Sequence, residues 1–153
     1  MVKLGFSAVV TAAVMLSAPA PVMAQSTGDA LPAPHPRDRL IPAAAPASLS
    51  DWKRKPVWHL LAACDVYFRM HAAQDDFFGD DSDSGRRLGR ANDMLNASRD
   101  RLMADRGLSG DAASALHAQA FRYFNHDEDL YGEVEPVVER RCRDGLAVGA
   151  RRP

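Results

Sequence analysis

The side chains of this chain that could bind a metal or move a proton are five histidines and twenty acidic residues. A di-iron centre in a helical bundle needs Glu-x-x-His motifs on facing helices, and none of the four histidines after residue 50 has a carboxylate three positions before it. The chain also lacks the His-Glu-x-x-His motif of zinc hydrolases and the Cys-x-x-Cys-His motif of covalent haem. We therefore predict that the protein holds no metal and no cofactor. Noncovalent haem, or another ligand in a bundle core, stays open as an alternative, with Met70, His71 or His117 as haem ligands.

The acidic segment 75–85 resembles part of a calcium-binding loop. If Gly85 takes the sixth place of an EF-hand loop, the twelfth place, which needs a bidentate glutamate, falls on Ala91. We therefore expect a solvated connection between two helices, with Asp83 or Ser84 capping the second helix. Binding of divalent cations by this segment stays open.

A second polar cluster places His126 next to Asp127, Glu128 and Asp129. A carboxylate beside a histidine can orient it as a general base, but no motif places a serine or thiol nucleophile there. A capped turn between two helices explains the same residues. A small hydrolase that uses these carboxylates and His126 stays open as an alternative, and we favour a protein that is not an enzyme.

The aromatic residues outside a single helical stripe are the candidate partner-binding residues. Trp52 and Trp58 flank three consecutive cations, and Phe77 lies at the other end of the first expected helix. An exposed tryptophan beside cations can anchor a protein interface or touch a membrane surface. The alternative is that one tryptophan covers the end of the core.

The overall charge excludes some partners. The chain has 19 basic and 20 acidic residues and a net charge of -1, so it has no strong field to attract nucleic acid or an anionic membrane. The local groups of arginines, at 86–90 and 140–143, have acids nearby. We expect no nucleic-acid partner.

The first residues have the pattern of a secretory signal peptide. A basic residue, Lys3, precedes an apolar stretch over 5–17, and small or aliphatic residues lead to Ala24. Pro19 and Pro21 end the apolar stretch, which is therefore shorter than the roughly 20 residues that a membrane span needs. We expect residues 1–24 to be cleaved after Ala24, leaving a periplasmic or secreted protein with no stable span.

The segment that follows, 25–50, is rich in proline and alanine and has neither helical nor alternating periodicity. Each proline removes a backbone donor, and so little apolar surface cannot offset the entropy of ordering the chain. We therefore predict a disordered linker over 25–50.

From residue 51 the apolar spacing becomes helical. The first expected helix begins at Pro56 and ends before Gly79, and the second runs from about Gly85 to Arg106. The third follows a cap at Ser109. The fourth spans about Glu135 to Asp144 and ends at Gly145. A turn is expected over 127–132, and a frayed tail over 147–153. The predicted fold is all-α, a small antiparallel four-helix bundle over 51–146.

The two cysteines lie on the apolar stripes of the first and last helices. These helices are neighbours in an antiparallel bundle, and an exported protein can keep a disulfide. We therefore predict a disulfide between Cys64 and Cys142, with two buried thiols as the alternative.

In size and architecture, a small exported helical domain with one disulfide resembles periplasmic immunity proteins, inhibitors and small chaperones. This resemblance involves no motif, so it assigns no residue. It implies a non-enzymatic protein that binds another protein of the cell envelope, for example as an inhibitor. The oligomeric state and the identity of the partner are not determined by the sequence.

Overall fold

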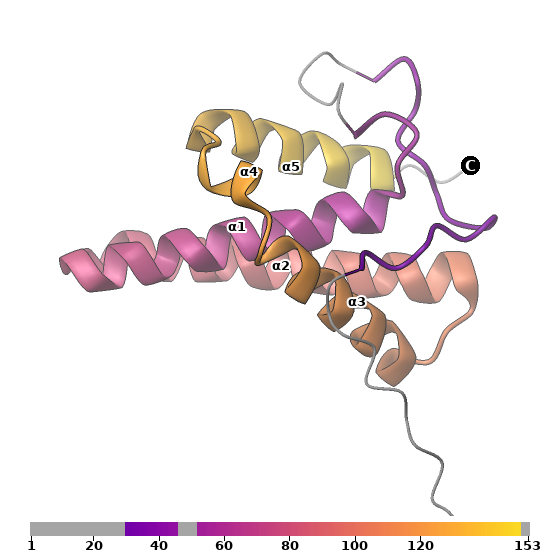
Figure 1. Cartoon of the computed structure of the whole chain (residues 1–153), viewed down its shortest axis with the longest axis horizontal. Helices are drawn as coiled ribbons and strands as arrows, with labels where there is room; N and C mark the ends of the chain where they lie inside the picture. The colour runs from indigo at the N-terminus through magenta and orange to yellow at the C-terminus, as the bar shows by residue number, and fades with distance from the viewer. Residues whose placement is uncertain (1–29, 46–51, 151–153) are drawn as a thin grey trace, which may run out of the picture.

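The computed structural model describes residues 30–45 and 52–150 of the 153-residue chain. These residues form four long helices and one short one, and Figure 1 shows their arrangement. Within the described ranges there is no strand, only one isolated antiparallel bridge between Leu40 and Pro56. The protein is all-α, as predicted, and its four long helices agree with the predicted number. The helices are α1 (Val57–Phe78), α2 (Asp81–Arg106), α3 (Gly110–Phe124), α4 (Glu128–Tyr131) and α5 (Glu135–Ala150).

Helix α1 is the centre of the fold. All residues from Val57 to Phe68 are buried, because α2, α3, α5 and the segment before α1 surround these first turns. A helix that is buried all round must be apolar nearly all round, and among those residues only His59 and Asp65 have side chains that ionise below pH 7. The other end of α1 extends with α2 beyond α5 as a projecting hairpin (Figure 1).

The hairpin between α1 and α2 has a two-residue connection. Gly79 has the left-handed φ of 81°, and the N–H groups of Gly79 and Asp80 donate to the carbonyls of Asp76 and Asp75 at 3.2 and 2.9 Å. These are the two hydrogen bonds of a Schellman motif. The predicted end of the first helix at Gly79 is confirmed.

The start of α2 differs from the prediction. The side chain of Asp80 accepts a hydrogen bond from the Asp83 N–H at 3.3 Å, so the cap is Asp80 and not Asp83 or Ser84. The helix therefore begins at Asp81, and Gly85 lies inside it. Since 81–85 is helical, the segment does not form a calcium-binding loop of the EF-hand type, which corrects the alternative considered for 75–85.

The predicted boundaries around α3 are confirmed. Gly107, with a φ of 68°, ends α2, and the Ser109 hydroxyl accepts from the Ala112 N–H at 3.3 Å at the start of α3. The expected turn over 127–132 is the single turn α4.

Helix α5 is longer than predicted. It continues to Ala150 and does not end at Gly145. The expected frayed tail, 147–153, is therefore helical up to Ala150. Gly145 instead faces α1: a Cβ at this position would lie 2.5 Å from Leu60 Cδ2. Its missing side chain permits the close approach of the two helices. Residues 151–153 lie outside the described ranges.

A disulfide joins α1 to α5. Cys64 and Cys142 are bonded, with their Cα atoms 6.0 Å apart, and they are 2% and 1% exposed. The predicted pairing is confirmed. The bond lies inside the main core cluster, together with Leu60, Phe68 and Val138.

The segment 30–45 departs from the predicted disordered linker. Ile41 is fully buried in the core, and backbone hydrogen bonds join it to Arg54 and Lys55 at 2.8 and 3.0 Å. The low average apolar content of the segment does not reveal this attachment, because it depends on single buried residues such as Ile41 and Asp38. The predicted signal peptide over 1–24 and the other residues of the predicted linker, 25–29 and 46–50, lie outside the described residues.

Candidate functional site

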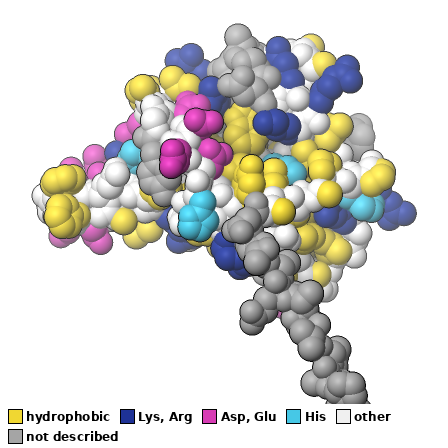
Figure 2. Space-filling model, in the orientation of Figure 1, with side chains coloured by type: hydrophobic (Ala, Val, Ile, Leu, Met, Phe, Trp, Pro, Cys, Tyr) yellow, Lys and Arg dark blue, Asp and Glu magenta, His cyan; other side chains and the backbone are white. Residues whose placement is uncertain are grey.

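The end of the α1–α2 hairpin carries two adjacent exposed phenylalanines. Phe77 and Phe78 are 84% and 81% exposed, and their ring centroids are 5.3 Å apart at an interplanar angle of 83°. In Figure 2 hydrophobic side chains gather at this projecting end of the molecule, with acidic side chains beside them. We call residues 75–83 the hairpin tip. The candidate residue Phe77 is therefore accessible to a partner.

The hairpin tip is strongly acidic. It contains five aspartates and no lysine or arginine. Asp75 is paired with Arg87 at 2.6 Å and Asp83 with Arg86 at 3.2 Å, whereas Asp76 and Asp81 are exposed. The two phenylalanines thus lie on a surface of negative potential.

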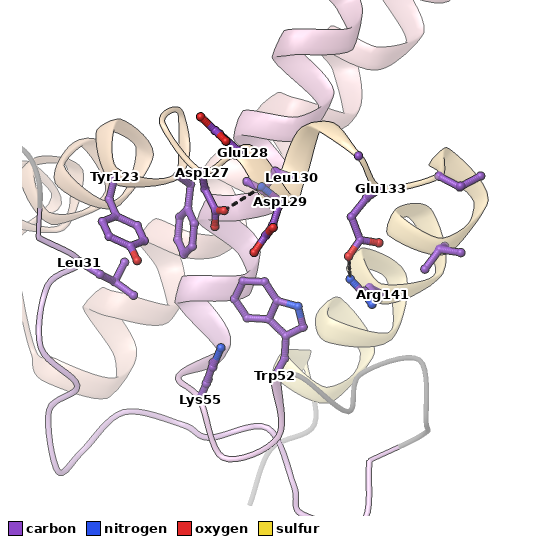
Figure 3. Close-up of a pocket in the computed structure, with 14 residues that line it drawn as sticks. Leu31, Trp52, Lys55, Tyr123, Asp127, Glu128, Asp129, Leu130, Glu133 and Arg141 are labelled. Carbon is purple, nitrogen blue, oxygen red and sulfur yellow. Dashed lines mark hydrogen bonds and ion pairs between the residues drawn. The ribbon is translucent and has the colours of Figure 1, made fainter.

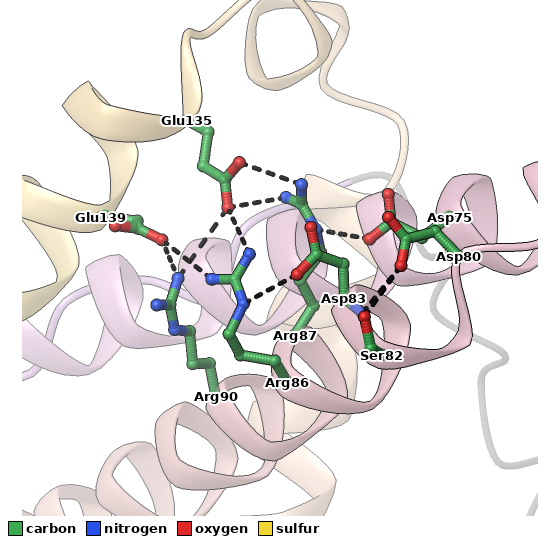
Figure 4. Close-up of polar contacts among 9 residues, drawn as sticks. All are labelled: Asp75, Asp80, Ser82, Asp83, Arg86, Arg87, Arg90, Glu135 and Glu139. Carbon is green, nitrogen blue, oxygen red and sulfur yellow. Dashed lines mark hydrogen bonds and ion pairs between the residues drawn. The ribbon is translucent and has the colours of Figure 1, made fainter.

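An ion-pair network holds the base of this hairpin against α5 (Figure 4). The Arg87 guanidinium contacts both oxygens of Glu135 at 2.9 Å, and its Nε lies 2.6 Å from Asp75. Arg90 forms an ion pair with Glu139, and its guanidinium carbon lies 5.7 Å from the centre of the Phe68 ring. Arg87 and Arg90, both in α2, thus each contact α1 and α5. Acids neutralise the basic group at 86–90, as expected from the sequence.

Trp58 cannot bind a partner in this fold. It is fully buried, its indole N–H donates to Asp38 at 3.2 Å, and the Arg106 guanidinium carbon lies 5.2 Å from its ring. The prediction that Trp58 is a candidate partner-binding residue is therefore wrong, because α1 has no exposed face at this position. Trp58 fulfils instead the alternative role of covering one end of the core.

Trp52 is half-buried beside an open groove. The groove has a volume of about 740 Å³ and lies between the residues before α1, the end of α3, α4 and the start of α5. Figure 3 shows Trp52 near its centre, with Tyr123, Asp127 and Asp129 around it. Trp52 packs on Phe124 with ring centroids 6.0 Å apart. Of the sequence candidates, Trp52 and Phe77 are thus accessible, and they lie on separate surfaces.

The cluster at 125–129 forms a capped turn. The Asp127 side chain accepts a hydrogen bond from the Asp129 N–H at 3.1 Å at the start of α4. His126 is exposed and does not line the groove that Asp127 borders. This histidine therefore lies outside the groove, and the capped turn that we expected accounts for Asp127 and Asp129.

A buried polar chain joins α1, α2 and α3, and sequence reasoning missed it. His117 lies 3.0 Å from Asp65 through Nε2 and 3.0 Å from the Ser98 hydroxyl through Nδ1. The three residues have the composition of a catalytic triad, but they are 4%, 1% and 0% exposed, so no substrate reaches the hydroxyl. The chain satisfies polar groups inside the core. The sequence signal for this chain is a single polar residue on the buried side of each of the three helices, Asp65, Ser98 and His117.

The candidate haem ligands are not assembled into a site. Both ring nitrogens of His117 have partners, so neither is free for iron. His71 is half-buried against Tyr67, with ring centroids 4.3 Å apart; burial, followed by the charge of Arg87, lowers its pKa. Met70 packs in the core cluster formed with α3. The interior space beside the disulfide is only about 10 Å³.

His59 is the most perturbed histidine. It is 2% exposed, and burial lowers its pKa to about 4, despite the opposing effect of the Asp38 charge. Its ring lies against that of Trp58 at 4.1 Å between centroids. The residue is therefore neutral above about pH 4 and is a core residue.

Among the described residues, no three His, Cys, Asp or Glu side chains are grouped so that they could hold a metal ion. Over the same ranges no helix has the length and apolar content to cross a membrane. Comparison with protein-family models, with curated proteins and with solved structures finds no match.

Proposed function

We propose that this protein is an exported, non-enzymatic binding protein that attaches to another protein of the cell envelope through Phe77 and Phe78. The observation that supports it is the exposure of both rings, at 84% and 81%, on the projecting hairpin tip. Burying a phenylalanine side chain contributes about 1.5–3 kcal/mol, so a partner that covers both rings gains a substantial fraction of a specific binding energy.

The tip is pre-organised for such contacts. The backbone is helical up to Phe78 and a Schellman motif closes the hairpin, while Arg87 and Glu135 attach its base to α5. A partner therefore orders few additional torsions, and the entropic cost of binding is small.

The charge of the tip indicates the chemistry of the partner. The hairpin tip that carries the two rings contains five aspartates, so the partner presents an apolar pocket with lysine or arginine at its rim. The same charges oppose insertion of the rings into an anionic membrane. An inhibitor that inserts this tip into a basic cleft of an envelope enzyme fits these requirements.

Export is part of the proposal. The pattern over 1–24 is that of a signal peptide, and the buried disulfide is suited to an oxidising compartment. Cell fractionation and mass spectrometry test this directly. The expected species is periplasmic or secreted, begins at Gln25 and contains no free thiol; a cytoplasmic chain that retains Met1 would contradict it.

The binding test compares a double variant, F77A/F78A, with the wild type and with Met103→Ala. Met103 is also an exposed large apolar residue, at 41%, but it lies at the other end of α2. After crosslinking in cells that produce the tagged protein, one specific crosslinked partner should be captured by the wild type and by Met103→Ala and lost in the double variant. Equal capture by all three would refute the role of the tip.

A further inference from the structure

The groove beside Trp52 combines an aromatic surface with carboxylates. Trp52 and Tyr123 are half-buried there, and Phe124 packs behind Trp52. Asp127 and Asp129 line the same space. In the view of Figure 3 the Asp129 carboxylate points toward the Trp52 ring.

The side chains around the groove have an excess of negative charge. Four carboxylates and two cations line it, and one of those cations, Arg141, forms an ion pair with Glu133. The three other carboxylates, at 127–129, therefore outnumber the one remaining cation, Lys55. A cleft with one sign of charge and apolar walls concentrates ligands of the opposite sign.

The chain itself places a cation on the aromatic surface. The ammonium nitrogen of Lys55 lies 4.9 Å from the centre of the Trp52 ring, which is within the range of a cation–π interaction. Lys55 is exposed and lies on a long, flexible side chain. It can therefore move away when another cation takes its place.

We propose that this groove binds a lysine or arginine side chain on an extended segment of another protein. The cation lies between the Asp129 carboxylate and the Trp52 ring and replaces the Lys55 ammonium. Apolar residues next to it contact Val134 and Val137, which line the groove and are 64% and 37% exposed. The volume of about 740 Å³ accommodates several residues of such a segment.

Charge argues against a second copy of this chain as the occupant through its hairpin tip. The tip would bring five aspartates to a groove that is itself acidic, and like charges across an interface oppose association. The groove and the tip are therefore separate sites, and the assignment of the groove does not depend on the proposed role of Phe77 and Phe78.

The test is an NMR titration of the mature protein with a blocked tetrapeptide, Ala-Lys-Val-Ala, and with the same peptide carrying norleucine in place of lysine. The lysine peptide should shift the Trp52 indole N–H signal in a saturable way, and the norleucine peptide should bind at least about tenfold more weakly. Because an exposed ion pair contributes about 0.2–1 kcal/mol, D129N should weaken binding of the lysine peptide by about 1.4- to fivefold. K55Q should tighten it by a similar factor, since the competing ammonium is gone.

Arg54→Gln is the matched control for K55Q, because it removes the same charge from the neighbouring residue, which does not line the groove. Little change is expected in that variant. Equal binding of the two peptides, or equal tightening in K55Q and R54Q, would overturn the proposal, because it would reduce the effect to apolar contact or to general charge. Tighter binding after removal of 151–153 would also overturn it, since the chain's own C-terminal arginines would then be the occupant.

Discussion

Arg106 binds Asp38 through two parallel hydrogen bonds, from Nε to Oδ1 at 2.6 Å and from Nη2 to Oδ2 at 2.7 Å. The Asp38 side chain is fully buried and Arg106 is 10% exposed. The same carboxylate accepts from the His35 N–H at 2.8 Å and from the Trp58 indole at 3.2 Å. Such charge-assisted bonds are about twice as strong as neutral ones, so this pair attaches the segment 30–45 to the end of α2.

Removal of the arginine should strongly destabilise the fold. In Arg106→Ala the buried Asp38 carboxylate loses its counter-ion, and breaking a buried pair in this way costs about 3–5 kcal/mol. Urea denaturation followed by circular dichroism measures the loss. Arg37→Ala is the control, because Arg37 is exposed and its side chain lies outside the pair; it should change the free energy of unfolding by less than about 0.5 kcal/mol. Equal effects of the two variants would contradict the role of the pair.

His59 should make the protein less stable in mild acid. Its folded pKa of about 4 lies below the ordinary value of 6.5, so between these two pH values the unfolded chain binds a proton that the folded chain does not. Its contribution is complete above pH 6.5 and is lost as the pH falls toward 4, a decrease of about 3 kcal/mol. His59→Asn, which keeps a hydrogen-bond donor but does not titrate, should remove the His59 part of this slope and leave the part due to His71, whose pKa burial also lowers. An unchanged slope in the variant would exclude His59 as the cause.

Asp38 should act in a separate, lower pH range. Burial alone would raise the pKa of this carboxyl, but the hydrogen bonds from Arg106, His35 and Trp58 outweigh it and lower the pKa below 3.8. Its contribution is present above pH 3.8 and is lost as the pH falls through the lowered folded value. Asp38→Asn should therefore reduce the loss of stability below about pH 4. It should not diminish the His59 slope above that pH, because the Asp38 charge raises the pKa of His59 and its removal lowers that pKa further. An equal reduction of the loss of stability in both pH ranges, below pH 4 and between pH 4 and 6.5, would contradict the assignment of the lower range to Asp38.

The helix ends and the disulfide could be predicted because their causes are local or few. Gly79 and Gly107 each supply a left-handed residue where a helix stops, and Ser109 is a cap in the expected place. The only two cysteines lie on apolar stripes, so the pairing of Cys64 with Cys142 had no competitor.

Other features could not be predicted because they depend on distant residues. Arg106 and Asp38 are 68 positions apart, and a composition average over 25–50 conceals the burial of Ile41. Which of the two tryptophans, Trp52 or Trp58, is accessible to a partner depends on the burial of the first turns of α1 on all sides. The groove has the same origin, since Trp52, Tyr123 and Val137 meet only in the folded chain.

Loss of the disulfide should remove much of the stability. The bond closes a loop whose ends are 78 positions apart, and the chain-entropy model gives about 4.5 kcal/mol for that length as an upper value. In C64A/C142A the midpoint of urea denaturation should fall accordingly. Dithiothreitol should lower the midpoint of the wild type and leave that of the double variant unchanged. A wild type that is insensitive to the reductant, once its thiols are shown to be reduced, would contradict this contribution.

Two helical glycines should respond to alanine in opposite directions. At Gly89 in α2 a Cβ would have no heavy atom within 4 Å, so Gly89→Ala should stabilise the protein by about 0.5–1 kcal/mol through helix propensity. At Gly145 in α5 the Cβ would lie 2.5 Å from Leu60 Cδ2 and 3.4 Å from its Cγ. Leu60 is 2% exposed and has little room to move, and overpacking of this kind costs about 1–3 kcal/mol, which exceeds the gain in propensity. Urea midpoints of the two variants should therefore lie on either side of the wild type. Stabilisation by both substitutions would show that α5 does not lie this close to α1 beside the disulfide.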